Sequence, residues 1–347
     1  MRILITGETN YLRDRNNNEY QMLQYFAEKN EDIRLILDSE LTKNHILEFK
    51  PDIVFSVNCG KLMDERLIDF LPPKIPLCLV LDDLFHFDNV SSLIPERCNV
   101  IVFMVKWKIL QEQYQRKFPN KIIKNFASRY VNTDIYTLHP EEKKKYDVLF
   151  YGTDNVTVGV PLNDIDKQYF DEKWMERNNT NIIPQTFNFY PLRKRLRDLF
   201  LKNSNKYNVN IFEPHGSYPT YPKGVKYITG IELSKIISQS YLTICTSSRS
   251  DTLLKKYLEI SSSGSILLGN IPSDYKDFFE NWVVKVDENM TDEEILCIVD
   301  KALSEKESLL KKSREFAHIV HKYHNYDCAY FDFINMANEI MKEYRLI

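Results

Sequence analysis

Residues 241–270 hold the side chains whose types and spacing are best suited to chemistry. The passage YLTICTSSRSDTLLKKYLEISSSGSILLGN is typical of an apolar strand, a polar loop, a helix and a second apolar strand. We expect Ser250 or Asp251 to cap the helix start, and Gly264 to take the left-handed position after its end. Because free amides and the dipole at a helix start attract anions, the passage predicts a phosphate site; the alternative is a capped structural helix. Further donors in the passage are Ser247, Ser248, Arg249, Thr252, Lys255 and Lys256.

A second group of titratable side chains lies in the run LDDLFHFDN, residues 81–89. Asp82, Asp83 and His86 follow an expected strand there. An Asp–His pair can accept a proton from a hydroxyl group near neutral pH, which makes these residues candidates for a catalytic base. The alternative is that they are loop caps and surface charges.

Short apolar runs alternate with amphipathic stretches along the whole chain. Because parallel strands need crossover helices, this alternation predicts an α/β protein with two tandem, doubly wound parallel sheets. In the first half we expect strands at 3–6, 33–37, 52–57, 76–81 and 99–104, and helices near 18–30, 41–49, 62–71 and 107–118. In the second half we expect strands at 147–151, 207–212, 241–246, 265–268 and 282–286, with helices near 191–202, 231–239, 252–262 and from there to the end.

The polar stretch HPEEKKKY, residues 139–146, is the best candidate for a linker between two domains. It separates a first domain, 1–138, from a second domain, 145–325. Residues 154–190 interrupt the alternation inside the second domain, and long connections of this kind are often lids or small subdomains. The amphipathic terminal helix within 330–347 is expected to cross back onto the first domain.

Composition and motifs exclude several classes of protein. With 46 basic and 49 acidic residues the net charge is −3, which lacks the basic excess of a nucleic-acid binder. The six scattered cysteines form no CxxC pair and are expected to be reduced core residues. No apolar run approaches the ~20 residues of a membrane span, and no leader precedes the first strand, so we expect a cytoplasmic protein. His318, His321 and His324 recur every three residues, but no cysteine or carboxylate cluster completes a metal site.

Several motifs of the second half carry a family resemblance. Asp251 and Glu259 are separated by seven residues, and Glu259 is followed by a small-residue turn, Gly264 and an apolar strand. This resembles the E-x7-E element of nucleotide-sugar glycosyltransferases of GT-B architecture, in which two Rossmann-like domains face each other across a cleft. KYLEISSSGSILLGN also resembles the R-x-x-E-x-x-x-x-G-x-x-L pattern of family-1-like and spore-maturation-type glycosyltransferases, with Lys256 where Arg is common. The likeness extends to the segments Lys144–Thr153, Pro191–Phe200 and 227–244.

The resemblance implies a role for each matching residue. Glu259 would accept hydrogen bonds from the ribose hydroxyls, and Asp251 would hold the transferred sugar. His86 would reach the donor sugar from the first domain. The donor phosphates would be bound by Arg193 (with Arg195 and Arg197 as rivals), Lys256, Ser248, Ser250, Thr252, Gly152 and Thr153.

We therefore expect a glycosyltransferase that moves a hexose-type sugar from a UDP- or GDP-sugar to an acceptor, with retention of configuration favoured. The acceptor is a glycan, a small molecule or a protein, and neither a metal nor another cofactor is required. Two alternatives stay open: a non-catalytic sugar-nucleotide-binding module, and a sugar-nucleotide epimerase of the same architecture.

Overall fold

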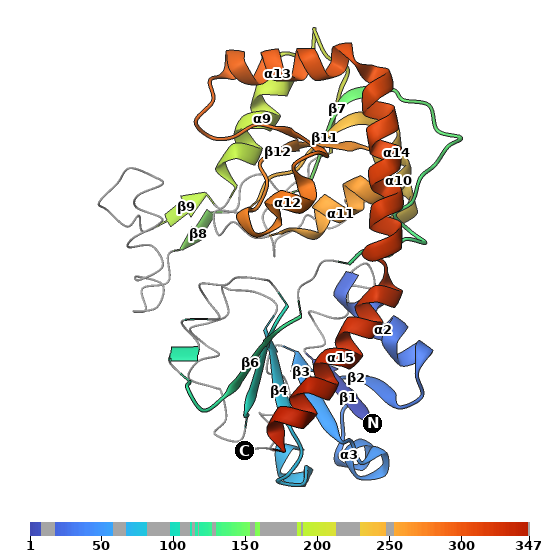
Figure 1. Cartoon of the computed structure of the whole chain (residues 1–347), viewed down its shortest axis with the longest axis vertical. Coiled ribbons are helices and arrows are strands. Elements are labelled where there is room, and N and C mark those ends of the chain that lie inside the picture. The colour runs from blue at the N-terminus through green and yellow to red at the C-terminus, as the bar shows by residue number, and fades with distance from the viewer. Residues whose placement is uncertain are drawn as a thin grey trace. The chain divides into compact units, whose positions relative to one another are not determined.

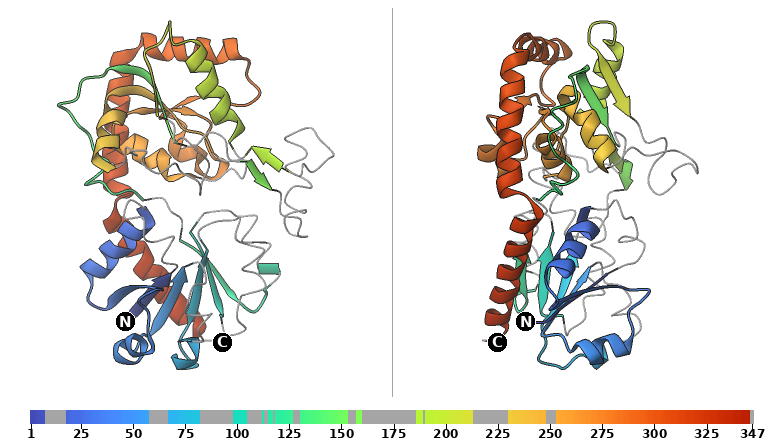
Figure 2. Two further views of the ribbon diagram at one scale, coloured as in Figure 1. Left: turned by 180° about the vertical axis from the view of Figure 1, so that it is seen from behind. Right: turned by 90° about the vertical axis from the view of Figure 1, so that its right-hand side faces the viewer.

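The chain divides into two compact units (Figures 1 and 2). The first combines Met1–Ser128 with the C-terminal segment Tyr326–Ile347, and the second takes in Arg129–Val160 and Phe170–Asn325. The computed structural model describes residues 1–7, 18–57, 67–81, 98–104, 112, 115–116, 118–126, 130–152, 157–159, 186–188, 190–212, 230–247 and 253–345. None of the helices described there combines the length and the apolar character that a membrane span requires.

The first unit is built on a six-stranded parallel sheet with the order β2-β1-β3-β4-β5-β6. Its central strands are buried on both faces, which explains why they are continuous apolar runs such as ILITG and LCLVL. The strands are β1 (Ile3–Gly7), β2 (Ile33–Leu37), β3 (Ile53–Val57), β4 (Leu77–Leu81), β5 (Val100–Phe103) and β6 (Ile122–Asn125). Its helices are α2 (Asn18–Lys29), α3 (Lys43–Phe49), the 3-10 helix η1 (Leu67–Phe70) and α15 (Tyr326–Tyr344).

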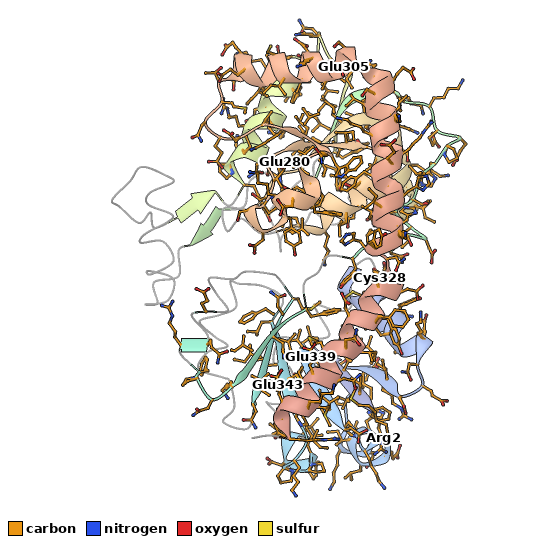
Figure 3. All side chains as sticks on the ribbon, viewed as in Figure 1. Arg2, Glu280, Glu305, Cys328, Glu339 and Glu343 are labelled. Atoms are coloured by element: carbon orange, nitrogen blue, oxygen red, sulfur yellow. The ribbon has the colours of Figure 1, made fainter. Side chains whose placement is uncertain are left out.

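Helix α15 completes the core of the first unit from the far end of the chain. Phe333 stacks on Phe26 of α2, with ring centroids 5.1 Å apart, and lies 4.9 Å from Phe55 of β3. At the edge strand β6, Lys124 Nζ bonds Glu339 Oε2 at 3.3 Å and Glu343 Oε1 at 2.5 Å; both glutamates are labelled on α15 in Figure 3. The terminal helix thus returns to the first unit, as the sequence predicts.

The second unit has a five-stranded parallel sheet with the order β10-β7-β11-β12-β13 and a separate antiparallel pair, β8-β9. Two apolar clusters cover its faces: one includes residues of α10, α11 and α14, and the other residues of α9 and α13. The strands are β7 (Tyr146–Tyr151), β8 (Thr157–Gly159), β9 (Thr186–Asn188), β10 (Val209–Phe212), β11 (Ser240–Ile244), β12 (Ile266–Gly269) and β13 (Val283–Lys285). The helices are α9 (Pro191–Lys202), α10 (Gly230–Ser238), α11 (Lys255–Ser262), η4 (Ser273–Tyr275), α12 (Lys276–Phe279), α13 (Asp292–Ser304) and α14 (Lys306–Tyr323).

Every strand expected from the sequence is present, with ends that differ by at most two residues, so the α/β class is confirmed. Strand β6 was not expected, because IIKN is short, half polar and lies at the sheet edge. The stretch 139–146 is part of the second unit, where Lys144 Nζ donates to the carbonyls of Ser240 (2.6 Å) and Gly264 (2.7 Å). Of the cysteines expected in the core, Cys297 is instead exposed.

Candidate functional site

The second sheet reverses its strand order next to β7: β10 lies on one side of β7, and β11 on the other. Open α/β sheets bind ligands at such a switch point, outside the carboxyl ends of the strands. Here those ends are Tyr151–Gly152 and Ile244–Cys245. Eight described residues are joined around them by the contacts given below, and we call this set the switch-point site: Tyr151, Gly152, Arg193, Thr246, Ser247, Lys256, Glu259 and Asn270.

Lys256 lies in the first turn of α11, and its ammonium group lies against the end of β7. Its Nζ donates to the carbonyl of Tyr151 at 2.9 Å and lies 4.6 Å from the centroid of the Tyr151 ring. Gly152 has a φ of +89°, and a Cβ at that position would overlap the ammonium. The N–H of Gly152 donates to the carbonyl of Phe212. Gly152 therefore contributes space for Lys256, whereas its own amide belongs to the sheet.

Glu259 lies one turn further along α11 and is 9% exposed. Its Oε2 accepts a hydrogen bond from the Tyr151 hydroxyl at 3.2 Å. Burial and the neighbouring carboxylate raise the pKa of Tyr151 well above its ordinary value, so the phenol keeps its proton and remains a donor. The carboxylate of Glu259 is thereby held in one orientation.

Arg193 belongs to α9, a helix on which three arginines alternate with other residues. Its NH2 donates to the carbonyl of Thr246 at 3.1 Å, and its guanidinium lies 3.7 Å from the centroid of the Tyr190 ring. It is 3% exposed, which is rare for an arginine and requires specific polar contacts. The helix thus presents Arg193 to the carboxyl end of β11.

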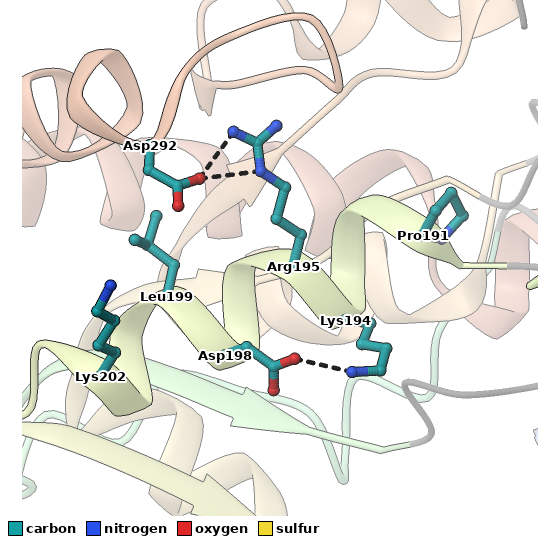
Figure 4. Close-up of a pocket in the computed structure, with 7 residues that line it drawn as sticks. All are labelled: Pro191, Lys194, Arg195, Asp198, Leu199, Lys202 and Asp292. Atoms are coloured by element: carbon teal, nitrogen blue, oxygen red, sulfur yellow. Dashed lines mark hydrogen bonds and ion pairs between the residues drawn. The ribbon is translucent and has the colours of Figure 1, made fainter.

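The two rival arginines lie elsewhere on α9. Arg195 bonds Asp292 Oδ1 through Nε (2.9 Å) and NH2 (2.7 Å), and Arg197 donates to Asp198 at 2.6 Å. Figure 4 shows Arg195 directed at Asp292 in a surface cavity of about 500 Å³, with Lys194 bonded to Asp198. The structure therefore selects Arg193 as the arginine of the switch-point site.

The end of β11 is fixed by Asn270, a residue that belongs to no motif recognisable in the sequence. Asn270 Oδ1 accepts from the Ser247 N–H at 2.9 Å, and Asn270 Nδ2 donates to Ser247 Oγ at 2.7 Å. A Cβ on the preceding Gly269 would overlap the carbonyl oxygen of Cys245. A glycine directly after an apolar strand was the available signal, because such a glycine often marks a close backbone approach.

The site combines two cations with one carboxylate in a desolvated place. Burial and the positive charge of Arg193 lower the pKa of Lys256 to about 7. Burial also raises the pKa of Cys245 to about 12, so this thiol stays protonated and unreactive. A negative charge between two cations offsets the energy of their mutual repulsion. The electrostatics of the site therefore favour a negatively charged ligand.

The helix start predicted at Ser250 or Asp251 is wrong. Helix α11 begins at Lys255, after the extended residue Leu254, which makes no side-chain cap. The expected end is confirmed: Gly264 follows the C-cap Ser263 with a φ of +77°. The other candidates Thr153, Ser248, Ser250, Asp251, Thr252, Asp82, Asp83 and His86 lie outside the described residues.

The C-terminal histidines have structural contacts. His321 Nε2 lies 3.1 Å from the carbonyl oxygen of Ser262, and the His324 ring packs on Phe278 with centroids 4.7 Å apart. Among the described residues, no group of three histidine, cysteine, aspartate or glutamate side chains is placed to hold a metal ion.

Solved structures of low sequence identity share this fold. No protein-family model matches the sequence, and neither does any curated protein. Sucrose-phosphate synthase tll1590 from Thermosynechococcus elongatus is 8% identical, with a TM-score of 0.60 over 99% of this chain and 100% of that one. Anabaena HepE in complex with UDP is 9% identical, with a TM-score of 0.56 over 98% and 100% of the two chains. A glycosyltransferase from Rickettsia africae ESF-5 is 11% identical, with a TM-score of 0.55 over 98% and 99%.

At these identities the likeness establishes the fold and leaves activity to other arguments. The alignments cover nearly the whole of this chain and the whole of those two chains, so the likeness takes in both sheets. The protein has the two-domain GT-B architecture of these structures, as its sequence predicts.

Proposed function

We propose that this protein is a glycosyltransferase whose nucleotide-diphosphate sugar binds at the switch-point site. The observation that carries the proposal is the convergence of Arg193, Lys256 and Glu259 at the carboxyl edge of the second sheet. Two cations suit the two phosphate charges of such a donor, and a fixed carboxylate suits the ribose hydroxyls. Support also comes from the structure of HepE in complex with UDP-glucose. That structure has the same fold and aligns with this chain at a TM-score of 0.52.

The proposed chemistry needs charge stabilisation at the leaving group. The bond between the sugar C1 and the phosphate oxygen breaks, and its electron pair goes to the nucleoside diphosphate. A bond forms between C1 and an acceptor oxygen, and the hydroxyl proton of the acceptor passes to a base. Arg193 and Lys256 would stabilise the negative charge that develops on the diphosphate, without reorganisation, because the protein already holds them in place.

The remaining assignments extend this proposal to residues outside the described ranges. Asp251 would hold the transferred sugar, which we propose to be a hexose, and retention of configuration is favoured. Asp82, Asp83 and His86 are proposed for the acceptor side and for the catalytic base. Further phosphate donors would be Ser248, Ser250, Thr252 and Thr153, and the donor would be a UDP- or GDP-sugar.

Calorimetry with a panel of UDP- and GDP-sugars tests the proposal, with one matched pair of variants. Arg193→Met is expected to weaken binding of the preferred donor at least tenfold, because it removes a charge-assisted interaction worth about 1.5–3 kcal/mol. Arg195→Met is the control on the same helix. It should leave affinity within twofold, because Arg195 is engaged with Asp292.

Three outcomes separate the proposal from its alternatives. Slow release of nucleoside diphosphate from a bound donor, accelerated by an acceptor, supports a transferase. Binding without any turnover supports a sugar-nucleotide-binding module, and interconversion of two sugar nucleotides supports an epimerase. If no nucleotide sugar binds, or if Arg195→Met weakens binding as much as Arg193→Met, the site assignment is wrong.

A further inference from the structure

The two cations of the switch-point site belong to different elements, Arg193 to α9 and Lys256 to α11. Each repels the other, and the proximity of Arg193 is one cause of the low pKa of Lys256. Like charges repel each other strongly where little water screens them, so they move apart unless a fixed connection holds their helices in place. The protein therefore needs a connection between these helices that holds before a ligand arrives.

A short hydrogen-bonded path supplies that connection. It starts at Arg193, whose NH2 bonds the carbonyl of Thr246. The next residue, Ser247, is bonded twice by the side chain of Asn270. The carbonyl of Asn270 then accepts from the Tyr257 hydroxyl at 2.6 Å, and Tyr257 directly follows Lys256 in the chain. Three hydrogen-bonded contacts and two peptide bonds thus join one cation to the other.

Asn270 is the centre of this path, and its side chain suits the task. It bonds the amide N–H and the hydroxyl oxygen of Ser247 at once, so donor and acceptor of the side-chain amide are both used on one partner. Ser247 is 6% exposed and Tyr257 is 0% exposed, so both partners of Asn270 are shielded from competing water, while Asn270 itself is half-buried. Buried and mutually satisfied hydrogen bonds of this kind rigidify the groups they join.

We propose that Asn270 is a positioning residue of the donor site, which holds the Arg193 and Lys256 charges at the separation that a diphosphate bridges. This rests on the proposed function, because it assumes that a nucleotide-diphosphate sugar is the ligand. Asn270 acts through its neighbours. It fixes the end of β11 against α11, so the two cations need no rearrangement when the phosphates bind.

The test compares the diphosphate-dependent part of binding in four proteins: wild type, Asn270→Ala, Ser247→Ala and the double variant. For each, calorimetry at one fixed pH gives the affinity for the nucleoside diphosphate of the preferred donor and for its nucleoside alone, and the ratio isolates the phosphates. Asn270→Ala is expected to lower this ratio about tenfold, the effect of losing one or two neutral hydrogen bonds, and to leave nucleoside affinity within twofold. The double variant should lower it no further than Asn270→Ala does, because Asn270→Ala already breaks the one bond that Ser247→Ala removes.

A pH profile gives a readout that a general loss of structure would not produce. In wild type, Lys256 faces Arg193, Cys245, Glu259 and Tyr151, and the repulsion from Arg193 helps to deprotonate it. Once the path is cut, the cations separate and Lys256 keeps its proton to higher pH. The fall in donor affinity between pH 6 and 8 should therefore be smaller in Asn270→Ala than in wild type.

The outcomes distinguish this inference from the proposed function. If wild type binds no nucleotide sugar, the proposed function is wrong and the inference falls with it. If wild type binds a donor but Asn270→Ala leaves the affinity ratio unchanged, only the positioning role is overturned. The same holds if the effects of Asn270→Ala and Ser247→Ala on this ratio add in full in the double variant. Should Asn270→Ala fail to fold, Tyr257→Phe removes one hydroxyl from the same path, and an unchanged ratio in that variant overturns the role equally.

Discussion

Donor affinity at the switch-point site is expected to fall as the pH rises from 6 to 8, because Lys256 loses its proton in that range. Its pKa in the free protein is about 7, lowered by burial and by Arg193. A bound diphosphate stabilises the ammonium, so binding favours the protonated form and raises the pKa. At pH 6 about nine tenths of the free protein carries this proton, and at pH 8 about one tenth, so affinity should drop roughly tenfold.

A nucleotide sugar is the right probe for this measurement, since its two phosphates keep a constant charge over the whole range. Calorimetry at pH 8 in two buffers of different ionisation enthalpy should reveal the uptake of nearly one proton on binding. Lys256→Arg is the matched control. A guanidinium stays charged throughout, so its profile should be flat.

The reasoning is refuted by a wild-type profile that is flat from pH 6 to 8 while binding remains strong. It is equally refuted if Lys256→Arg keeps the full tenfold fall, because another group would then be titrating. Two of the neighbours that face Lys256 do not titrate between pH 6 and 8, because the pKa of Cys245 is raised to about 12 and that of Tyr151 well above its ordinary value.

Three further changes test other contacts. Gly152→Ala should destabilise the protein by about 1–2 kcal/mol, because alanine is strained in the left-handed backbone conformation of this position. The added methyl group should also displace Lys256, so both the melting temperature and the donor affinity should fall. Unchanged values would contradict the close approach of Lys256 to Gly152. Tyr151→Phe should weaken nucleoside affinity severalfold by releasing Glu259, with no loss of fold, as circular dichroism and calorimetry would show. Lys144 has a pKa lowered to about 7 by burial, below its unfolded value, so its contribution to stability rises between pH 7 and 10. Urea unfolding of Lys144→Met should show a smaller rise over that range than wild type, and an equal rise would exclude this lysine as the source.

The elements that the sequence predicts well are those whose pattern depends on burial alone. Strands such as Ile53–Val57 and Leu77–Leu81 are apolar on both faces because helices cover both sides of the sheet, so their runs stand out against polar surroundings. Strand Ile122–Asn125 was missed for the opposite reason. It lies at the edge, where Lys124 finds its partners on a helix more than two hundred residues away.

The candidate site divides in the same way. Glu259 and Lys256 stand out through a motif and its spacing. Arg193 is the first candidate on its helix, with Arg195 and Arg197 as rivals, and the contacts in the structure separate the three. Asn270 carries no local signal beyond Gly269, because its function arises from the approach of β12 to the end of β11. The start of α11 was misplaced because Ser250 and Asp251 have the chemistry of a cap, whereas the helix begins after Leu254.

The return of α15 to the first unit has a consequence for how the protein is made. Phe26 and Phe55 are synthesised before the second unit, whereas Phe333, which packs against both, is synthesised after it. Domains usually fold as they emerge, the N-terminal one first. Here the second unit has its whole sequence available before the first one does. A chain that stops after Asn325 lacks helix α15, which packs on the first unit. The unit whose synthesis begins first is therefore the later of the two to complete its fold.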